Sequence, residues 1–319
     1  MSSSKGADPE LEDLLKRELN TSVLKSEGRS GGGCISEGST YSTDSGKVFI
    51  KVNLKSKAKA MFDGEAASLE KLYEMDVVKV PKPIKVITIP SGGAAFVMEN
   101  LDITGSLSAQ AATLGEQMAR LHLRNKEIAQ KEKKGDSFVH KDSVVQSVKQ
   151  FGFDVPTCCG YIRQSNAWES TWEKFYAGKI QEQIDMLPAE DITAVNELWS
   201  QVVQKLPRFF TGLDIFPALM HGDLWGGNAA EVADGPVVFD PASFYGHSEY
   251  DLAISRMFGG FSGKFFDSYF RIIPKEKGLG NRLELYKLFH YMNHWNHFGG
   301  GYKQSSLNTL RGLIKMQFD

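Results

Sequence analysis

The sequence contains little cysteine, no long apolar run and no excess of either charge. Its three cysteines, Cys34, Cys158 and Cys159, are an odd number with two adjacent members, so we expect no disulfide framework and no zinc site. A reducing, cytosolic compartment is the simpler expectation. No apolar stretch approaches the roughly 20 residues that cross a bilayer. The first ten residues carry two acids and no apolar segment, so we expect neither a membrane span nor a secretory signal.

The charges are nearly balanced, with 37 Lys plus Arg against 39 Asp plus Glu and a net charge of −2. A nucleic-acid-binding surface needs a basic excess, so we expect no nucleic-acid partner. Hydrophobic residues make up 41% and charged residues 24%, which is typical of a globular protein. A chain of 319 residues is expected to fold as one or two packed units.

The apolar patterns divide the chain into a β-rich part and a helical part. The early patterns predict helices over residues 10–20 and 57–75 and strands over 48–52, 85–87 and 94–99. From residue 106 helical patterns dominate, among them residues 114–123, and the charged residues 126–143 are predicted to form a surface loop. We therefore predict an α+β, bilobal fold. A small antiparallel β-rich lobe would span residues 1–103, and a larger, mainly helical lobe residues 104–319.

The strongest chemical signal is the segment 221–228 (HGDLWGGN), followed by an apolar strand that ends at Asp240. Asp223 and Asn228 lie five residues apart. Phosphoryl transfer needs a carboxylate near the attacking hydroxyl and oxygen ligands for Mg²⁺ on the phosphates. An Asp, an Asn and a second Asp in this order match the catalytic and metal loops of the kinase superfamily. A helix cap or a surface turn would explain the residue types alone, but not the whole arrangement.

Lys51 lies in a predicted apolar strand, where an inward-facing charge requires a partner. ATP phosphates and a glutamate of the following helix would supply one. Glu65 is the first candidate, and Glu70 and Glu74 lie further along. The alternative is a lysine on an edge strand that faces water. Its place between a Gly-rich hairpin and a Glu-bearing helix favours the ATP-binding interpretation.

Two further segments are candidates for nucleotide contacts. A Gly-rich turn includes Gly32, Gly33 and Ser36 and follows neither the protein-kinase nor the Walker spacing. Its backbone N–H groups and the Ser36 hydroxyl would suit phosphates, although a flexible turn is the alternative. The second segment ends the small lobe, where a hinge would bind adenine. Its predicted adenine contacts are Glu99, Asn100 and Leu101.

Several longer segments resemble the fructosamine/ketosamine-3-kinase family. This family belongs to the protein-kinase-like fold, which also includes aminoglycoside phosphotransferases and choline kinases. The resemblance covers about residues 10–315. It rests on the segments 31–36 (GGGCIS), 48–53 (VFIKVN), 157–160 (TCCG), 221–228, 239–249 (FDPASFYGHSE) and 293–299 (NHWNHFG). Within the family, residues 226–227 and 160–161 are nearer the ribulosamine-acting branch than the fructosamine-acting one.

The resemblance implies an ATP- and Mg²⁺-dependent kinase. Its substrates would be ketoamines, namely ribulosamine, psicosamine or fructosamine adducts, chiefly on protein lysines. Phosphorylation of the sugar 3-hydroxyl destabilises the adduct and releases the amine, which is a protein deglycation reaction. The implied roles are Asp223 as catalytic base, Asn228 and Asp240 as Mg²⁺ ligands, Lys51 and Glu65 for the phosphates, and Glu99 to Leu101 for adenine.

The sequence departs from protein kinases at two places. Gly222 stands where many protein kinases have the Arg that reads a phosphorylated activation loop, and Asp240 is followed by Pro-Ala instead of Phe-Gly. We therefore expect a constitutively assembled site in a metabolic kinase. Two alternatives stay open: a kinase for another small alcohol, such as an aminoglycoside or choline, and a non-catalytic kinase-like binding module. The second type usually lacks the lysine, the base or a metal ligand.

Aromatic residues provide candidate sugar contacts. We expect Trp225 with His294 or Trp295 to line the sugar pocket, since aromatic faces and polar edges suit polyols. Core packing is the alternative for Trp295. His290 and His294 are four apart, but the HExxH pattern of a zinc site is absent. Asp251 is expected to be structural, as a helix N-terminal acid or a hydrogen-bond partner of the catalytic loop.

Cys34 lies among glycines, whose backbone N–H groups would stabilise a thiolate. The resemblance implies redox sensitivity here, with a homodimer linked through Cys34 when the protein is oxidised. A small buried residue is the alternative. Under reducing conditions a monomer and a homodimer both fit. Cys158 and Cys159 are expected to fill the core.

Overall fold

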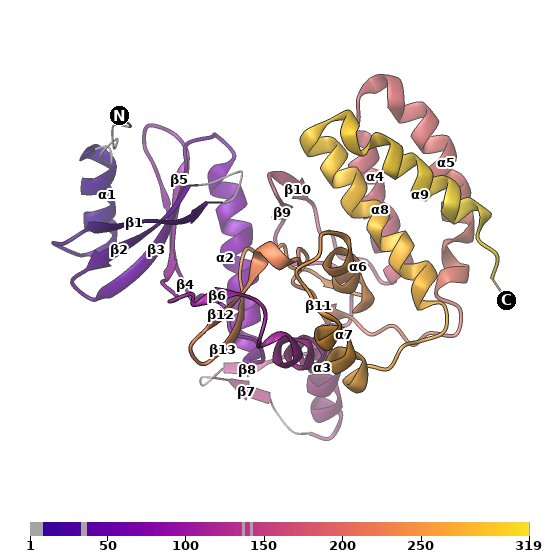
Figure 1. Ribbon diagram of the computed structural model, residues 1–319, viewed down its shortest axis with the longest axis horizontal. Helices are drawn as coiled ribbons and strands as arrows, with labels where there is room; N and C mark the ends of the chain where they lie inside the picture. The colour runs from indigo at the N-terminus through magenta and orange to yellow at the C-terminus, as the bar shows by residue number, and fades with distance from the viewer. Residues whose placement is uncertain (1–8, 33–36, 136–137, 141–142, 319) are drawn as a thin grey trace.

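The structure is a computed structural model that describes residues 9–32, 37–135, 138–140 and 143–318. A β-rich part at the N-terminal end is followed by a mainly helical part, and the two ends of the chain lie on opposite sides of the molecule (Figure 1). The α+β, protein-kinase-like fold predicted from the sequence is confirmed. The predicted boundary between residues 103 and 104 stays a prediction. Within the described ranges no helix has the length and apolarity to cross a membrane.

The N-terminal part is a five-stranded antiparallel sheet. Its strands are β1 (Lys25–Gly32), β2 (Glu37–Thr43), β3 (Gly46–Asn53), β4 (Pro83–Thr88) and β5 (Ala94–Glu99), in the order β1-β2-β3-β5-β4. Alternate residues of a strand point to opposite faces, and β5 is buried on both. Ala95 and Val97 face α1 (Pro9–Leu19), whereas Phe96 and Met98 face α2 (Ala58–Met75). This double burial explains why β5 is a continuous apolar run.

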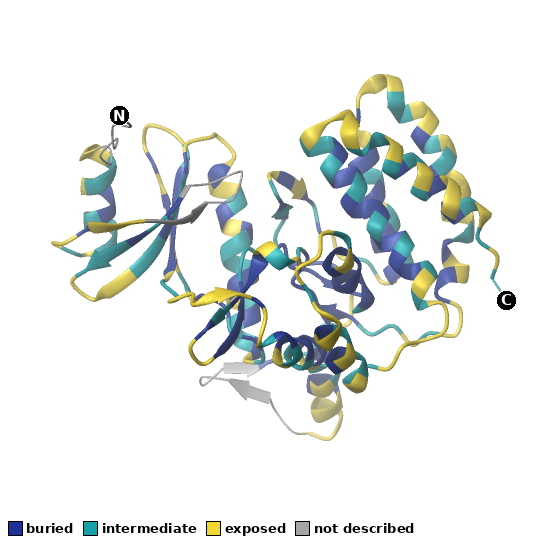
Figure 2. Cartoon of the chain, in the orientation of Figure 1, coloured by how far each residue is buried: buried dark blue, intermediate teal, exposed yellow. Residues whose placement is uncertain are grey.

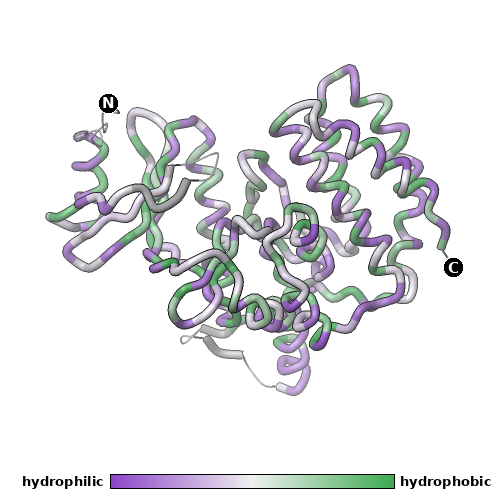
Figure 3. The backbone as a smooth tube through the Cα atoms, in the orientation of Figure 1, coloured by the Kyte–Doolittle hydropathy of each residue, from purple (hydrophilic) through white to green (hydrophobic). Residues whose placement is uncertain are grey.

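The second part is built from helices with short strands between them. The helices are α3 (Ala111–Lys133), α4 (Trp172–Asp185), α5 (Ala189–Phe209), α6 (Glu249–Met257), α7 (Gly263–Ile272), α8 (Leu279–Phe298) and α9 (Lys303–Lys315), with 3-10 turns η1 (Gly226–Asn228) and η2 (Gly300–Tyr302). The short strands are β6 (Gly105–Ser106), β7 (Phe138–His140), β8 (Ser143–Val145), β9 (Thr157–Cys159), β10 (Ile162–Gln164), β11 (Ala218–Leu219), β12 (Ala229–Val232), β13 (Gly235–Val238) and β14 (Tyr245–Gly246). Hydrophilic and hydrophobic residues alternate along α5, α8 and α9 (Figure 3), as expected of helices with one face in a core.

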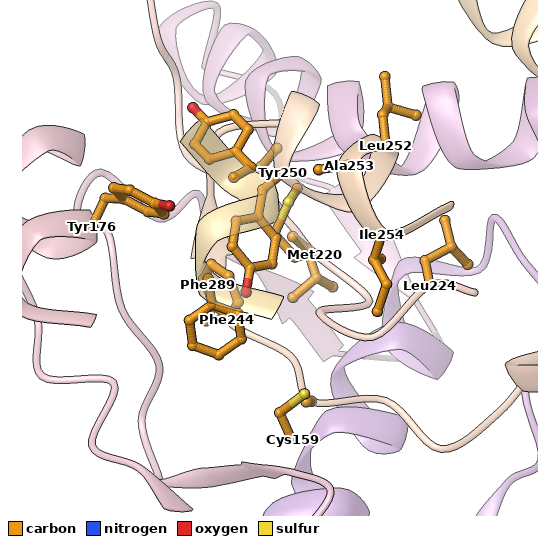
Figure 4. Close-up of a cluster of buried hydrophobic side chains, with 14 of the residues drawn as sticks. Cys159, Tyr176, Met220, Leu224, Phe244, Tyr250, Leu252, Ala253, Ile254 and Phe289 are labelled. Atoms are coloured by element: carbon orange, nitrogen blue, oxygen red, sulfur yellow. The ribbon is translucent and has the colours of Figure 1, made fainter. Parts of the chain in front are cut away.

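Aromatic side chains dominate the core beneath the segment 221–228. Met220 and Leu224 are fully buried, and Figure 4 shows Met220 near Tyr250 and Leu224 near Ile254. The Phe244 and Tyr250 rings meet edge to face, with centroids 5.1 Å apart. Rings in this geometry contribute roughly 0.5–1.5 kcal/mol beyond the area they bury. The segment 221–228 therefore packs on a close-packed aromatic core.

The loop predicted over residues 126–143 is wrong for its first part. Helix α3 continues to Lys133 because its inner face stays apolar beyond the predicted end. Ile128 and Ala129 are buried in the core, and the Asn125 amide donates to the carbonyls of Val148 (2.8 Å) and Pro217 (2.6 Å). The surplus of Lys and Glu lies on the exposed side of the same helix.

Candidate active site

The segment 221–228 lies between β11 and β12 and brings the predicted catalytic residues together. The Asn228 amide donates to the Asp223 main-chain oxygen (2.9 Å) and to its Oδ2 (3.1 Å). Strands β12 and β13 pair as a hairpin, and Phe239 N donates to Asn228 O (3.1 Å) just before Asp240. The hairpin thus returns the chain beside η1. Asp223, Asn228 and Asp240, the first and last of which are 17 residues apart in the sequence, therefore lie close to one another.

Asp251, at the start of α6, fixes the beginning of this loop. It is fully buried and accepts from the backbone N–H groups of His221 and Gly222, both at 2.8 Å. His122 Nε2 donates to the same carboxylate at 3.2 Å. Burial alone would raise the pKa of Asp251, but these donors outweigh it and the pKa lies below its usual value. The loop-binding role, one of two structural roles expected for Asp251, is the one observed.

The backbone conformation and the surrounding backbone allow only glycine at position 222. It has φ +86°, a region that side chains strongly disfavour, and a Cβ here would lie 2.0 Å from the Ala242 carbonyl oxygen. In return, Ala242 N donates to His221 O at 2.8 Å. The sequence suggested only that Gly222 replaces an arginine. The structure adds that the predicted catalytic loop (residues 221–228) and the predicted metal loop (residues 240–243) touch at this residue.

Lys51 on β3 links the sheet to the metal loop. Its Nζ lies 2.6 Å from Glu65 Oε1 on α2 and 2.5 Å from Asp240 Oδ1. Burial would lower the pKa of Lys51, but the two carboxylates hold it above its usual value, so the lysine is charged. Of the three predicted glutamates only Glu65 pairs with Lys51, while Glu74 pairs with Lys71.

Burial also changes the acidity of the predicted base. The pKa of Asp223 is raised from its usual value to about 7, chiefly because the carboxylate is desolvated. The hydrogen bond from Asn228 opposes this shift, and the negative charges of Asp240 and Asp251 add to it. A carboxylate with a pKa near neutrality is a stronger base than an exposed one, which suits proton abstraction from a hydroxyl.

Helix α2 is held against the metal loop by a group of buried contacts that we call the α2 brace: Gly64, Ser68, Thr157 and Ser243. Ser243 N donates to Ser68 Oγ (3.1 Å), which in turn donates to Gly64 O (2.8 Å). Thr157 Oγ1 donates to Ser243 O (3.4 Å). All three hydroxyl residues are at most 1% exposed. The brace thereby holds Glu65, on the next position of α2, toward Lys51.

Replacing Gly64 with Ala is expected to displace α2. A Cβ at Gly64 would lie 2.5 Å from Pro156 O and 3.0 Å from Thr157 Cα, so the helix must move away from β9 and carry Glu65 with it. A misplacement of 1 Å near reacting groups can reduce rate by about 10²-fold. We expect a loss of that order in kcat/KM for the nucleotide, measured by steady-state kinetics. Gly178→Ala in α4, which has open space around it, is the control and should leave kcat/KM unchanged; equal kinetics for the two variants would contradict the brace.

Comparison with known proteins identifies the family of the chain. The family profile for fructosamine kinases matches residues 8–316. The chain is 55% identical over 311 residues to mouse ketosamine-3-kinase, covering 96% of this chain and all of the mouse protein. The chain belongs to the fructosamine kinase family. This kinase is also 37% identical over 312 residues to the chloroplastic protein-ribulosamine 3-kinase of Arabidopsis thaliana, covering 97% of this chain and 88% of the plant protein.

Solved structures place this fructosamine kinase family member in the protein-kinase-like fold. A Haemophilus somnus protein assigned as a fructosamine-3-kinase superposes with a TM-score of 0.75 at 22% identity, covering 95% of this chain and 96% of that one. The aminoglycoside phosphotransferase APH(4)-Ia superposes with a TM-score of 0.56 at 11% identity and 95% coverage of each chain. At these identities the likeness concerns the fold alone.

The predicted adenine segment joins the two parts of this kinase. Glu99 is turned toward Lys82: its Oε2 accepts from Lys82 N (3.1 Å), and its own N donates to Lys82 O (2.9 Å). Asn100 Oδ1 accepts from Thr40 Oγ1 at 2.8 Å, and Leu101 packs on the β12–β13 hairpin. A cavity of about 320 Å³ is lined by Glu99 together with the end of α2 and residues 76–80. The adenine contact predicted for Glu99 stays a prediction.

The Gly-rich turn is only partly described. Gly32 is the last residue of β1, and β2 begins at Glu37, which agrees with the antiparallel hairpin predicted here. Gly33, Cys34 and Ser36 lie outside the described residues, and so do the predictions made for them. Cys159 is buried as expected, whereas Cys158 is only partly buried. Burial raises the pKa of the Cys158 thiol to about 11, which makes it a poor nucleophile.

The three predicted sugar contacts separate into two groups. Trp225 is 38% exposed next to Asp223, and His294 is partly exposed. Trp295 is 3% exposed and belongs to the main core, so the predicted substrate contact at this residue is replaced by its core-packing alternative. Adjacent residues of a helix point about 100° apart, which lets His294 face outward while Trp295 packs inward.

Sequence reasoning did not identify the residues that support the site. His122, Gly64 and Ser68 are separated from their partners by 129 residues in the first case and by more than 90 in the others. Only the small size of Gly64 and Ser68, four apart on one face of a predicted helix, hinted at a close approach of another segment.

Proposed function

We propose that this kinase is an ATP-dependent ketosamine 3-kinase. It would transfer the γ-phosphoryl group to the 3-hydroxyl of ribulosamine, psicosamine or fructosamine adducts on protein lysines. The observation that carries the proposal is the joint assembly of Asp223, Asn228 and Asp240 with the Lys51–Glu65 pair. The names of the mouse and Arabidopsis relatives support the choice of substrate class.

Each residue has a role that follows from its surroundings. Asp223, with its pKa near 7, would accept the proton of the sugar hydroxyl as that oxygen attacks the γ-phosphorus. Lys51 would bind the phosphates, since its charge is fixed by two carboxylates and it contacts Asp240, a proposed Mg²⁺ ligand. Glu65 would keep the Lys51 ammonium in place. The main chain after Glu99 and the Gly-rich turn would hold the adenine and the phosphates.

The donor set at this site fits Mg²⁺. The Asn228 Nδ2 atom is engaged with Asp223, so the Asn228 carbonyl oxygen is the atom that would face a cation. The Asp240 carboxylate is 40% exposed, and Asp240 has φ +57°, a conformation uncommon outside glycine. Asn228 and Asp240 would hold Mg²⁺, a cation that prefers such oxygen ligands. When bound it would neutralise charge on the phosphates.

The product chemistry explains a repair role. A phosphate on the third carbon destabilises the sugar–amine adduct, and its breakdown returns the free amine. Protein deglycation would then follow from the single phosphoryl transfer. The few cysteines support the cytosol as the compartment, and glycated proteins or small ketoamines would be the substrates of a monomer or a homodimer.

A substrate panel tests the proposal. The purified protein with Mg²⁺-ATP should phosphorylate a ribulosamine and a fructosamine, and nuclear magnetic resonance of the product should place the phosphate on the third carbon. Choline and an aminoglycoside serve as matched alternatives, because related folds act on such alcohols. Turnover of the aminoglycoside or choline without the ketoamines would overturn the substrate class, and no turnover of any compound would favour a binding module.

A further inference from the structure

Five aromatic side chains form a continuous surface beside the catalytic loop. We call Trp225, Phe258, His294, Phe298 and Tyr302 the aromatic shelf. Trp225 and Phe258 meet edge to face with centroids 6.3 Å apart, and Phe258 stacks on His294 at 4.7 Å. His294 also contacts Phe298 at 5.6 Å and Tyr302 at 5.0 Å. The rings therefore follow one another from the catalytic loop to the α8–α9 turn.

The shelf is open to solvent. Trp225 and Phe258 are each 38% exposed, and Phe298 is 60% exposed. Figure 2 shows the turn that joins α8 to α9, around η2, as an exposed region. Exposed large apolar side chains that touch one another mark binding surfaces more often than isolated ones do.

Close backbone contacts at glycines position the aromatic shelf next to the active site. A Cβ on Gly226 would lie 2.7 Å from Gly260 Cα, so the catalytic loop and the end of α6 meet backbone to backbone. This contact places Phe258 against Trp225. The Trp225 ring lies across Gly227, where a Cβ would be 2.3 Å from the ring. Trp225 N donates to Asp223 O at 3.1 Å, which ties the first ring of the shelf to the proposed base.

We propose that the aromatic shelf binds the amine portion of the ketoamine: the lysine side chain that carries the sugar and the peptide around it. The proposal rests on the function proposed above. It places the sugar at Trp225 and the polypeptide over Phe298 and Tyr302. Catalysis on protein adducts would thus use a surface that a free sugar does not reach.

The chemistry of the amine supports this occupant. The nitrogen of a ketoamine is a secondary amine that carries a proton at neutral pH, and cations bind to aromatic faces within about 6 Å. Burial lowers the pKa of His294, so this ring in the middle of the shelf is neutral and does not repel the cation. The methylenes of lysine would cover the more distant rings. From Trp225 the shelf runs over Phe258, just after α6, to the end of α8 and to η2, and these helices lie away from the N-terminal sheet that carries Lys51 (Figure 1). This direction argues against the nucleotide as its occupant.

Two adducts of the same sugar distinguish binding at the aromatic shelf from binding in the sugar pocket. The ribulose adduct of methylamine reaches only the start of the shelf, and the ribulose adduct of a lysine within a blocked pentapeptide reaches its far end. Phe298→Ala should raise KM for the peptide adduct about tenfold, the order expected for the loss of one buried apolar contact. It should leave KM for the methylamine adduct and for ATP unchanged.

Two controls complete the experiment. Leu54→Ala removes another exposed apolar side chain, 67% exposed near the start of α2, and should change none of the three constants. Wild-type turnover of the methylamine adduct tests the proposed function by itself, and its absence overturns both proposals. If that adduct is phosphorylated but Phe298→Ala changes both ketoamine KM values equally, or neither, only the shelf proposal fails.

Discussion

Replacing Asp223 with Asn is expected to reduce phosphoryl transfer by about 10²–10⁴-fold, the contribution of a positioned general base. The substitution keeps the size of the side chain and removes the proton acceptor. The protein should stay folded, because the catalytic loop is fixed by Asp251 and not by Asp223. The measurement is the single-turnover rate at saturating Mg²⁺-ATP and ketoamine, with nucleotide binding measured in parallel. Wild-type turnover in the variant would exclude Asp223 as the base.

The pH dependence follows from the same residue. Since the pKa of Asp223 is about 7, kcat/KM should fall as the pH decreases below 7, tenfold for each unit, while the base becomes protonated. The effect of pH on stability has the opposite direction: ionisation of Asp223 raises activity but lowers the stability of the fold. A buried carboxyl whose pKa is raised binds more protons in the folded state than in the unfolded state, so its ionisation destabilises the fold as pH rises. Asp223→Asn should therefore melt at a higher temperature than wild type at pH 8, and this difference should shrink toward pH 4.

Gly222→Ala is expected to reduce stability more than the other glycine variants proposed for this protein, at Gly64, Gly178 and Gly212. The added Cβ would lie 2.0 Å from Ala242 O, and the residue would be held at φ +86°. Neither segment can move away easily, because Gly222 N donates a hydrogen bond to Asp251 and Ala242 N donates one to His221 O. We expect a loss of at least about 4 kcal/mol in the free energy of unfolding, the range of the most damaging single substitutions. Activity should fall with it, since Asp223 is the next residue.

Gly212→Ala is the matched control for this prediction. Gly212 has nearly the same backbone conformation, φ +80°, but nothing lies within 4 Å of an added Cβ. It should lose only the roughly 1–2 kcal/mol that a side chain costs in the left-handed region. Urea denaturation of both variants measures the difference. Equal losses would show that conformation alone, and not the contact with Ala242, makes Gly222 necessary.

The parts of the site that the sequence revealed are those with local patterns. Asp223, Asn228 and Asp240 follow one another around a short hairpin. Lys51 and Glu65 lie on consecutive elements, so the sequence predicted a glutamate partner for Lys51 but left Glu70 and Glu74 open as alternatives to Glu65. Loop closure over such short distances leaves few arrangements of the chain. The fold class followed in the same way from the change of apolar period near residue 106.

The parts that were missed depend on contacts between distant segments. Ser68 meets Ser243 across 175 residues, and no local pattern specifies that encounter. The end of α3 was misplaced because the buried Ile128 and Ala129 are a small apolar set among many charges. His294 and Trp295 could not be separated by sequence, since the register of α8 against the core decides which side chain is outside.

The α2 brace has a consequence for how the cell would control this protein. Its contacts are buried hydroxyls and main-chain atoms, with no charge in the brace itself that an added phosphate group would attract or repel. We therefore expect the Lys51–Glu65–Asp240 arrangement to form without phosphorylation. The rate of phosphoryl transfer in the cell would then depend on the concentration of the substrate and on the concentration of the protein, and not on a signalling event.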